Sequence, residues 1–457
     1  MKGLEVSEVK WSYVKSQSDV VRFDSYYYAK EFLSDENIIA RQDNQSLKEL
    51  KADLLSFGAY SLNNFVEYKE SGIPFIRGVN MKDGVLDFSD TLYIDETAHK
   101  LLWKSEVKPN TILLSMSGTI GDVAIAMPEY KYPMNSNQDI AKITLNDGLN
   151  PYYLYAFLRS KYGQNFLKRE ARGSVQQHVF LSQMENIRVP LLTADFQQKI
   201  ETLVKSAHAK LAESKSLYAQ AEDTLLCELG LKDWQPKNKA VSIKSFSDFA
   251  SSGRLDAEYY QSKYDEIEER IKAVPYKTIA ELQTFNARGV QPDYISDGTV
   301  SVVNSKHILE NGLDYDNFEK TTTDFLKQNE RATIKENDIL IYTTGANIGR
   351  AQPYLLSELA VASNHVNILR LDGINPLYAA FVLNSKIGRL QTEKMCTGSA
   401  QAELYPSDIE KFLIPILPSE TQNQIAKLIQ TSFALRQESK RLLESAKLAV
   451  EREIENP

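Results

Sequence analysis

The chain has 457 residues, of which 42% are hydrophobic and 25% charged, and its formal net charge at pH 7 is −8. No apolar run is long enough to cross a membrane, and the acidic balance argues against a chain that holds DNA by its own charge alone. The N-terminus lacks the apolar core of a signal peptide, and the two cysteines, Cys227 and Cys396, lie far apart. We therefore expect a cytoplasmic protein of two or three domains without a disulfide framework.

The first half of the chain begins with strands and ends with a long helix. β-branched apolar runs between Gly, Asn and Asp turn residues predict strands at 74–76, 111–115 and 122–126. Asn150-Pro151 predicts the start of a helix, because Asn is a good N-cap and Pro suits the first turn. A heptad stripe then predicts one helix from about Asp195 to Leu229.

The second half repeats this order. Strands are predicted at 300–303, 338–342 and 366–369, and Asn375-Pro376 predicts another helix start. A final helix is predicted from about Glu420 to Glu455. Its apolar or small residues follow a 3-4 spacing at Ile425, Leu428, Ser432, Leu435, Ser439, Leu442, Ala446 and Ala449. This spacing is typical of a coiled-coil seam.

The two halves are copies of one another. Residues 150–204 align with 375–429 at a constant offset of 225, and 17 of these 55 positions are identical, where chance would give about three. Copies this long indicate a duplicated domain rather than a solenoid. The repeated landmarks include Arg22-Phe23-Asp24 with Arg254-Leu255-Asp256, Ser117-Gly118 with Thr344-Gly345, Ser160-Lys161 with Ser385-Lys386, and Gly173-Ser174-Val175-Gln176 with Gly398-Ser399-Ala400-Gln401.

These patterns predict an α+β protein with pseudo-two-fold symmetry. Two similar mixed α/β domains, at 1–193 and 233–418, are expected to be joined by helices at 194–232 and 419–457 that pair antiparallel as a coiled coil. Two similar heads suit a pseudo-symmetric partner, of which duplex DNA is the commonest. A fixed rod between them would act as a ruler between two short half-sites.

Polar residues in predicted loops are candidate DNA contacts, because Arg pairs with guanine and Gln with adenine. Between Arg159 and Arg188 the local charge balance is +4, whereas the equivalent second stretch is neutral. Turn formation, helix capping and plain solvation remain open alternatives for all of them. The candidates are Arg77, Asn80, Lys82, Ser117, Thr119, Arg169, Arg172, Ser174, Gln176 and Gln177 in the first half, and Asn304, Lys306, His307, Thr344, Asn347, Lys394, Ser399 and Gln401 in the second.

No motif for catalysis, a cofactor or a metal stands out. Asn150-Pro151-Tyr152-Tyr153 is similar to the Asn-Pro-Pro-Tyr motif of adenine methyltransferases but lacks its second Pro, so a helix start is the favoured interpretation. A phosphate-binding G-x-x-x-x-G-K-[ST] loop and a zinc-binding H-E-x-x-H helix are both absent, and the five histidines are scattered. We therefore expect no catalytic, cofactor-binding or metal-binding residue in this chain.

The order of these motifs resembles the specificity subunit of type I restriction–modification enzymes over nearly the whole chain. The matching pieces are residues 254–260 (Arg-Leu-Asp-Ala-Glu-Tyr-Tyr) with their echo at 22–27, the turns at 117–121 and 344–349, and the Gly-Ser-x-Gln loops at 173–176 and 398–401.

The resemblance implies a non-catalytic subunit whose domains 1–193 and 233–418 are target-recognition domains for a bipartite double-stranded DNA site. It also implies that two methyltransferase subunits, which use S-adenosylmethionine, dock on the conserved helices. Restriction and translocase subunits using ATP and Mg²⁺ can join them in bacterial or archaeal defence against phage. Two other classes stay open: a self-sufficient methyltransferase or nuclease, and a two-headed protein-interaction scaffold that does not read DNA.

Overall fold

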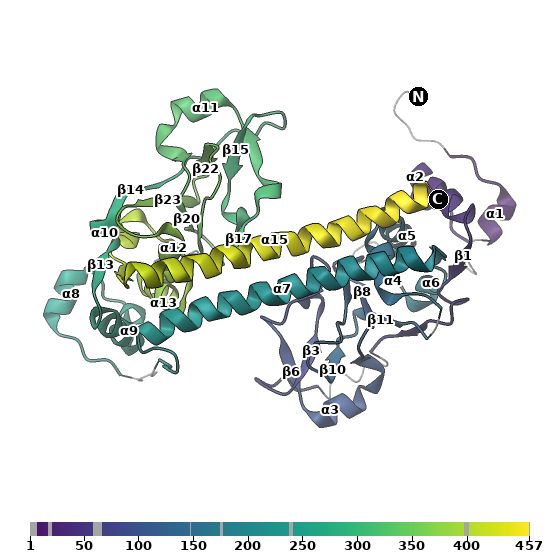
Figure 1. The fold of residues 1–457 in the computed structure, drawn as a ribbon, viewed down its shortest axis with the longest axis horizontal. Helices are drawn as coiled ribbons and strands as arrows, with labels where there is room; N and C mark the ends of the chain where they lie inside the picture. Colours follow the sequence, from purple (N-terminus) through teal and green to yellow (C-terminus); the bar gives the residue numbers. More distant parts are fainter. Residues whose placement is uncertain are drawn as a thin grey trace. The chain divides into compact units, whose positions relative to one another are not determined.

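The computed structural model describes residues 7–16, 21–57, 66–146, 148–173, 177–236, 241–396 and 402–456. Its contacts divide the chain into two compact units (Figure 1): unit 1 holds residues 1–211 and 437–457, and unit 2 holds residues 212–436. The boundaries cut through both long helices, so each unit takes a part of each helix. The four-part division expected from the sequence stays a prediction, because the compact units follow contacts rather than helix ends.

Unit 1 is a mixed domain of helices and short strands. Its sheets have the strand orders β6-β3-β10-β7 and β2-β11-β8-β9, with the small pairs β1-β12 and β4-β5 beside them. β3 and β10 pair in parallel, and the other pairs are antiparallel. The helices are α1 (Trp11–Ser16), α2 (Lys30–Ala40), α3 (Glu96–Leu101), α4 (Pro151–Arg159), α5 (Lys161–Glu170) and α6 (Leu181–Met184), with the short 3-10 turns η1 (Ser25–Tyr28), η3 (Gly78–Asn80) and η4 (Trp103–Ser105). The strands are β1 (Asn44–Ser46), β2 (Asp53–Leu55), β3 (Ile73–Ile76), β4 (Met81–Lys82), β5 (Val85–Leu86), β6 (Leu92–Ile94), β7 (Glu106–Val107), β8 (Ile112–Ser115), β9 (Val123–Ile125), β10 (Met134–Ser136), β11 (Ile140–Thr144) and β12 (Arg188–Pro190).

Unit 2 has the same topology strand for strand. Its sheet orders are β18-β15-β22-β19 and β14-β23-β20-β21, with the pairs β13-β24 and β16-β17. The helices are α8 (Phe246–Ser252), α9 (Ser262–Lys272), α10 (Ile279–Leu282), α11 (Thr323–Gln328), α12 (Pro376–Asn384), α13 (Lys386–Met395) and α14 (Pro406–Ile409), with η5 (Ala257–Tyr260), η6 (Ser305–His307), η7 (Tyr315–Asn317) and η8 (Glu330–Ala332). The strands are β13 (Tyr276–Thr278), β14 (Gln283–Arg288), β15 (Val300–Val303), β16 (Ile308–Leu309), β17 (Gly312–Leu313), β18 (Glu319–Thr321), β19 (Thr333–Ile334), β20 (Ile339–Tyr342), β21 (Ala351–Pro353), β22 (Ala360–Ala362), β23 (Val366–Leu371) and β24 (Leu413–Pro415).

The positions that repeat in the sequence hold the same structural joints in both units. Asn150 caps α4 by accepting hydrogen bonds from the backbone N–H of Tyr152 and Tyr153, and Asn375 caps α12 in the same way. The backbone N–H of Asn150 donates to Gln197 Oε1 at 2.9 Å, and that of Asn375 donates to Gln422 at 3.3 Å. The helix-start interpretation of both Asn-Pro pairs is confirmed, and each cap also ties its unit to a long helix.

Glycine is required where two helices meet in each unit. A Cβ at Gly163 in α5 would lie 2.6 Å from the Cα of Leu158, and a Cβ at Gly388 in α13 would lie 2.1 Å from the carbonyl oxygen of Leu383. These distances are far below van der Waals contact with a backbone that cannot move aside. The identity of Gly163 and Gly388 in the alignment therefore reflects the close packing of α4 on α5 and of α12 on α13.

Two long helices, α7 (Ala194–Glu228) and α15 (Ser419–Glu455), run through both units. The predicted helices are confirmed to within a residue or two. In unit 1 the first part of α7 packs in one core with the last part of α15, through residues such as Ile200, Val204, Leu443 and Val450. In unit 2 the last part of α7 shares a core with the first part of α15, so the pairing is antiparallel, as expected.

The seam of α15 differs in part from the predicted heptads. Ile425, Ser432, Ser439 and Ala446 are buried as expected, whereas Ile429, Leu443 and Val450 are buried in place of their half-buried predicted neighbours. The shift arises because α15 packs on α7 and on the mixed domains together, which widens its buried face. Within unit 2, Ser214 and Ser432 face each other, and each hydroxyl donates to the other's backbone carbonyl oxygen at 2.8 Å.

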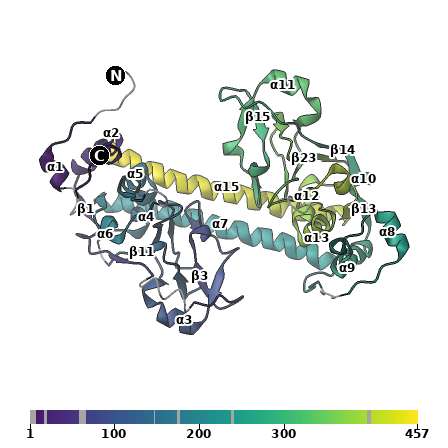
Figure 2. The same ribbon diagram turned by 180° about the vertical axis from the view of Figure 1, so that it is seen from behind.

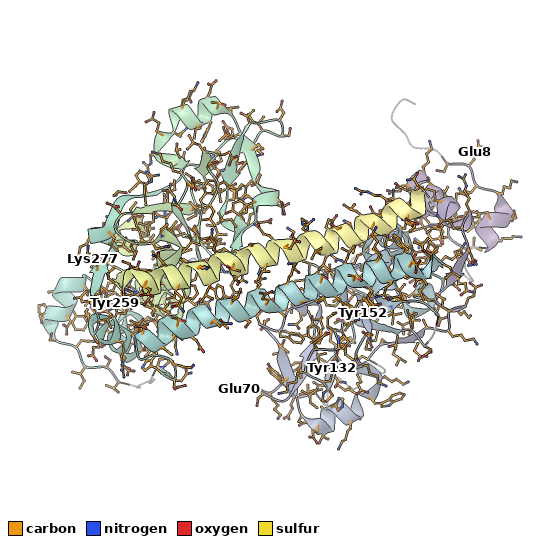
Figure 3. The ribbon with its side chains drawn as sticks, in the orientation of Figure 1. Glu8, Glu70, Tyr132, Tyr152, Tyr259 and Lys277 are labelled. Atoms are coloured by element: carbon orange, nitrogen blue, oxygen red, sulfur yellow. The ribbon has the colours of Figure 1, made fainter. Side chains whose placement is uncertain are left out.

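Figures 1 and 2 both show α4 lying against α7. Tyr152, labelled in Figure 3, is on this face of α4, and the Lys205 ammonium lies 5.0 Å from the centre of its ring. Glu201 accepts a hydrogen bond from the Asn150 side chain at 2.6 Å and pairs with Lys205. Among the described residues, no helix has both the length and the apolar character needed to span a bilayer.

Candidate nucleic-acid interface

In unit 1, the ends of three strands and the loop after α5 meet at one edge. The backbone N–H of Asn137 donates to the Ile76 carbonyl at the end of β3, and that of Met116 donates to the Asp139 carbonyl. The loop joins this edge because the N–H of Val179 donates to the Met116 carbonyl at 3.0 Å. We call this edge the strand-end cluster of unit 1; its polar residues are Arg77, Ser117, Asp139, Arg172 and His178.

One side-chain contact and several backbone contacts hold this cluster together. Ser117 Oγ donates to Asp139 Oδ1 at 2.7 Å. Arg172 and His178 exchange two backbone hydrogen bonds. Ser117 also bridges to His178, whose ring lies 4.7 Å from that of Phe180. Backbone segments that carry serine, aspartate, histidine and arginine therefore meet at this edge.

Unit 2 builds the same frame with the same backbone bonds. The N–H of Ser363 donates to the Val303 carbonyl, that of Thr343 to the His365 carbonyl, and that of Leu404 to the Thr343 carbonyl. Thr344 bridges to Glu403, as Ser117 bridges to His178 in unit 1. The strand-end cluster of unit 2 therefore consists of Asn304, Thr344, His365 and Glu403, with Arg288 from β14.

The acidic residue and the histidine exchange places on this shared frame between the two units. Unit 1 has Asp139 in the turn and His178 in the loop, whereas unit 2 has His365 in the turn and Glu403 in the loop. Arg288 adds a cation that lies 3.7 Å from Glu403 and stacks on the Tyr405 ring at 4.6 Å. A hydrogen bond from Tyr405 lowers the pKa of Glu403, so its carboxylate stays ionised. Two edges with one backbone and different donors and acceptors can recognise different ligand sequences.

The structure brings several predicted contacts to these edges in an accessible form. In unit 1, Thr119 and Gln177 are exposed and Arg77 and Arg172 are half-buried. In unit 2, Lys306 and Asn347 are exposed and Asn304 is half-buried. Lys82 is exposed on the β4-β5 hairpin. Ser174, Gln176, Ser399 and Gln401 lie outside the described residues.

Five predicted contacts are buried: Asn80, Ser117, Arg169, His307 and Thr344. Asn80 and His307 occupy equivalent positions after β3 and β15. Asn80 Oδ1 accepts the backbone N–H of Arg77 at 2.9 Å, and His307 Nδ1 accepts that of Asn304 at 3.0 Å. Since these side chains close a tight turn from inside, they cannot also reach a base edge.

Arg169 and its equivalent Lys394 form ion pairs within their own units. Arg169 Nη1 pairs with Glu36 at 2.9 Å, and its guanidinium lies 4.2 Å from the centre of the Tyr27 ring. Lys394 pairs with Glu268, and its ammonium lies 5.1 Å from the centre of the Tyr259 ring. Burial alone would raise the pKa of Glu268, but the hydrogen bond from Lys394 holds this pKa below its usual range. These cations lock α5 and α13 onto their neighbours, which explains their burial.

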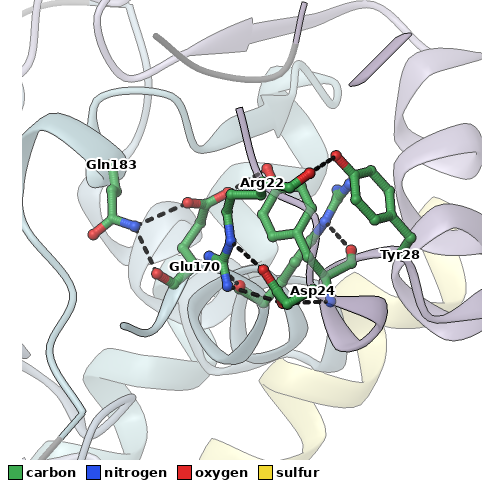
Figure 4. Close-up of polar contacts among 7 residues, drawn as sticks. Arg22, Asp24, Tyr28, Glu170 and Gln183 are labelled. Carbon is green, nitrogen blue, oxygen red and sulfur yellow. Dashed lines mark hydrogen bonds and ion pairs between the residues drawn. The ribbon is translucent and has the colours of Figure 1, made fainter. Parts of the chain in front are cut away.

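The Arg22-Asp24 motif belongs to the same joint. Figure 4 shows Arg22 forked onto the Asp24 carboxylate, with Tyr28 donating to the Arg22 carbonyl at 3.0 Å. Glu170 accepts hydrogen bonds from Tyr27 and Gln183 beside it. A motif that resembled a family signature in the sequence thus anchors the entry segment to the end of α5.

Several exposed cations near the β4-β5 and β16-β17 hairpins are paired locally. Lys82 pairs with Asp87 at 2.8 Å. Burial alone would raise the pKa of Asp87, but the hydrogen bonds from Lys82 and Ser89 hold this pKa at about 2. Arg77 pairs with Asp90 at 3.1 Å, and Lys306 pairs with Glu319. A phosphate must therefore compete with a carboxylate at each of these positions.

Sequence reasoning missed the residues that distinguish the two edges. Asp139 and His178 in unit 1, and His365, Glu403 and Arg288 in unit 2, come together through hydrogen bonds across 22 to 116 residues of chain, for example from Arg288 to the Leu404 carbonyl. The alignment contained one usable signal, because His178 and Glu403 occupy the same position in the two copies. Among the described residues, no group of three His, Cys, Asp or Glu side chains is placed to hold a metal ion.

The chain is duplicated, and its two units have equivalent frames with different polar edges. It therefore belongs to a class of protein that presents two related but unlike surfaces. The family model of the type I restriction modification DNA specificity domain matches this chain twice, over residues 47–216 and 275–445. The chain therefore belongs to the family of type I restriction–modification specificity subunits, and both mixed domains are specificity domains.

Curated relatives carry the same description. The specificity subunit of the type I restriction enzyme MjaIX of Methanocaldococcus jannaschii is 24% identical over 327 residues, which cover 71% of each chain. The specificity subunit of the type I restriction enzyme EcoBI of Escherichia coli is 24% identical over 157 residues, covering 34% of this chain and 32% of its own. The solved S subunit of the type I system of M. genitalium aligns with 90% of this chain and 94% of its own, at 14% identity and a TM-score of 0.45.

Proposed function

We propose that this chain reads a bipartite double-stranded DNA target, one half with each unit, for a type I restriction–modification complex. The observation that carries this proposal is the pair of strand-end clusters, which share one backbone frame but exchange their acidic and basic side chains. A duplication that kept the frame and changed the edge fits selection for two different half-sites on one kind of ligand.

The accessible groups of each edge are the proposed contacts. In unit 1 these are Thr119, Arg172 and Gln177; Arg pairs with guanine and Gln with adenine through two hydrogen bonds each. In unit 2 they are Lys306, Asn347 and His365, beside Arg288. The acidic edge residues Asp139 and Glu403 would repel phosphate and accept from cytosine N4, which adds discrimination.

The catalytic steps are proposed to lie in partner subunits. Two methyltransferase subunits would dock on this chain and use S-adenosylmethionine, and restriction subunits would use ATP and Mg²⁺. Because the net charge is −8, these partners would also supply much of the contact with phosphates. We place the complex in the cytoplasm of a bacterial or archaeal cell, where it would act against phage DNA.

The lengths of α7 and α15 are proposed to fix the gap between the half-sites, since both helices run through both units. Removing one heptad from the middle of α7 together with the facing heptad of α15 should shift the preferred gap and leave both half-sites unchanged. An unchanged gap, with the deleted chain still folded, would contradict this ruler.

The direct test is a map of modified bases in genomic DNA. Cells with this chain and its methyltransferase would be compared with cells that have the methyltransferase alone. A new methylated motif in two unequal parts around a fixed gap is the expected result. No new methylation, with a methyltransferase that is active beside another specificity subunit, would favour a protein scaffold that does not read DNA.

A further inference from the structure

Exposed apolar side chains gather in two short segments that occupy the same place in the duplication. Of 22 large apolar side chains that are exposed among the described residues, eight lie in residues 11–26 and 241–255. They are Trp11, Val21, Phe23 and Tyr26 in unit 1, and Val241, Ile243, Phe246 and Leu255 in unit 2. By contrast, Leu448 is the one large apolar side chain exposed along α7 and α15.

At the end of each segment, an arginine forms an ion pair with an aspartate two residues later. Arg22 Nε donates to Asp24 at 2.8 Å, and Arg254 Nε donates to Asp256 at 2.8 Å. Both arginines also donate to a backbone carbonyl at the end of the neighbouring helix, Arg169 in unit 1 and Met395 in unit 2, at 3.2 Å each. The backbone of Phe23 and of Leu255, each of which lies between the paired arginine and aspartate, is therefore held in place.

That fixed residue is apolar and points to solvent in both units. Phe23 is 77% exposed and Leu255 is 84% exposed. Trp11 stacks on Phe23, with ring centres 6.0 Å apart, which enlarges the apolar surface in unit 1. A large apolar side chain left in water adds little to the stability of its own fold, because its burial is what would stabilise it.

The duplication indicates what covers these surfaces. The strand-end clusters diverged in charge, whereas the Arg-apolar-Asp frame kept its geometry in both units. A surface kept alike in both halves suits two copies of one partner, while the unlike edges suit two different half-sites. The exposed groups here are apolar, which excludes the phosphate backbone as the occupant and fits a protein pocket.

We propose that Phe23 and Leu255 are the central anchors of two equivalent docking surfaces for two copies of the methyltransferase subunit, each inserting into the same apolar pocket of its copy. This rests on the proposed function, which supplies the partner, and adds that the entry segments bind it. The long helices offer mainly polar side chains to solvent and contribute a polar part of the contact.

The test uses the full-length chain with its methyltransferase. Phe23→Ser, Leu255→Ser and the double variant would be compared with Leu101→Ser and Leu309→Ser, which remove leucines that are also exposed but lie outside both segments. Mass photometry would give the number of methyltransferase copies bound, and titration would give the affinity. Thermal unfolding of each variant would confirm that the chain is folded.

Each single variant is expected to weaken one of the two binding events at least about 10-fold, as truncation of a central anchor does. The double variant should weaken both, and the controls should bind two copies like the original chain. Two copies bound to the double variant with affinity within about twofold of the original would overturn the anchor proposal alone. No methyltransferase bound by the original chain would overturn the docking part of the proposed function together with the anchors.

Discussion

The strand-end clusters of the two units have one backbone and two chemistries. At equivalent points the turn has Asp139 in unit 1 and His365 in unit 2, and the loop has His178 and Glu403. The hydrogen bonds that hold these points are backbone bonds, so any side chain can occupy them without loss of the frame. The comparison teaches that recognition can diverge at an edge while the joints that carry the edge stay fixed.

The buried residues of the two units also differ, and we expect these differences to affect stability. Lys142 in β11 is buried between the two sheets of unit 1, where its ammonium donates to Ser136 Oγ at 3.0 Å. At the equivalent position β23 has Ile368, which is buried in an apolar core. Asn80 and His307 cap the same turn with an amide and an imidazole. Differences inside the units therefore change stability, whereas differences at the edges should change specificity.

The largest effect is expected where both units share a joint. Gly163→Ala and Gly388→Ala should each destabilise their unit by more than about 3 kcal/mol, because the new Cβ overlaps a neighbouring backbone. Gly78→Ala is the control, since a Cβ there meets nothing within 4 Å. Hydrogen exchange resolved by peptide would report the stability of each unit. A tolerated substitution at either helix junction would mean that the shared frame is not rigid.

The next effect separates structural cations from DNA contacts. Arg169→Ala should lower the stability of unit 1 by about 3 kcal/mol, because it leaves Glu36 unpaired and removes the cation over Tyr27. Lys394→Ala should lower the stability of unit 2 by about 1 to 2 kcal/mol, because the Lys394 side chain forms fewer hydrogen bonds than that of Arg169. Under conditions where both variants are folded, the methylated motif should stay unchanged. A changed motif in either variant would restore these residues as base contacts.

Replacing the buried lysine should stabilise unit 1. Burial lowers the pKa of Lys142 from 10.5 to about 7, so between these values the unfolded chain binds more protons than the folded one. The stability of unit 1 should therefore rise with pH from about 7 to 10. Lys142→Ile, which copies unit 2, should add about 2 kcal/mol at pH 7 and flatten this rise, as followed by chemical unfolding at several pH values. A loss of stability at pH 7 would show that the hydrogen bonds to the ammonium outweigh its desolvation.

The smallest effect concerns the cap in unit 2. Burial lowers the pKa of His307 from its ordinary value of 6.5, so the unfolded chain takes up the proton first as the pH falls. The stability due to neutral His307 is complete above about pH 6.5 and is lost below it. His307→Asn, which copies Asn80, should leave stability at pH 7.5 nearly unchanged and add about 1 kcal/mol at pH 5. Equal pH dependence in both chains would assign the loss to another group.

Local rules predicted the elements well because the signals were local. The Asn-Pro caps, the β-branched runs and the two long helices depend on residues next to each other in the chain, and all are present. The predicted buried residues of α15 were correct only in part, because contacts with the mixed domains decide which flank of the helix is buried.

The sites were harder to predict because charge and polarity do not reveal burial. Arg169 lies in a basic stretch and Lys394 at the equivalent position, so both look like DNA contacts, yet their partners Glu36 and Glu268 lie more than 120 residues away. Asp139 and His365 follow ordinary turns and become notable only when the strand ends meet. Comparing the two copies position by position would have found the His178 and Glu403 exchange.

The central claim is that each unit reads its own half of the target from its own edge. The most direct measurement is the methylated motif obtained with Arg172→Gln, because Arg172 holds its loop through backbone bonds and the substitution changes its half-buried side chain without removing them. One half of the motif should lose a preference at one base pair, with methylation weaker by about 10-fold or more at the original base. The other half and the gap should stay as they were. Changes in both halves, or an identical motif at full efficiency, would contradict the account.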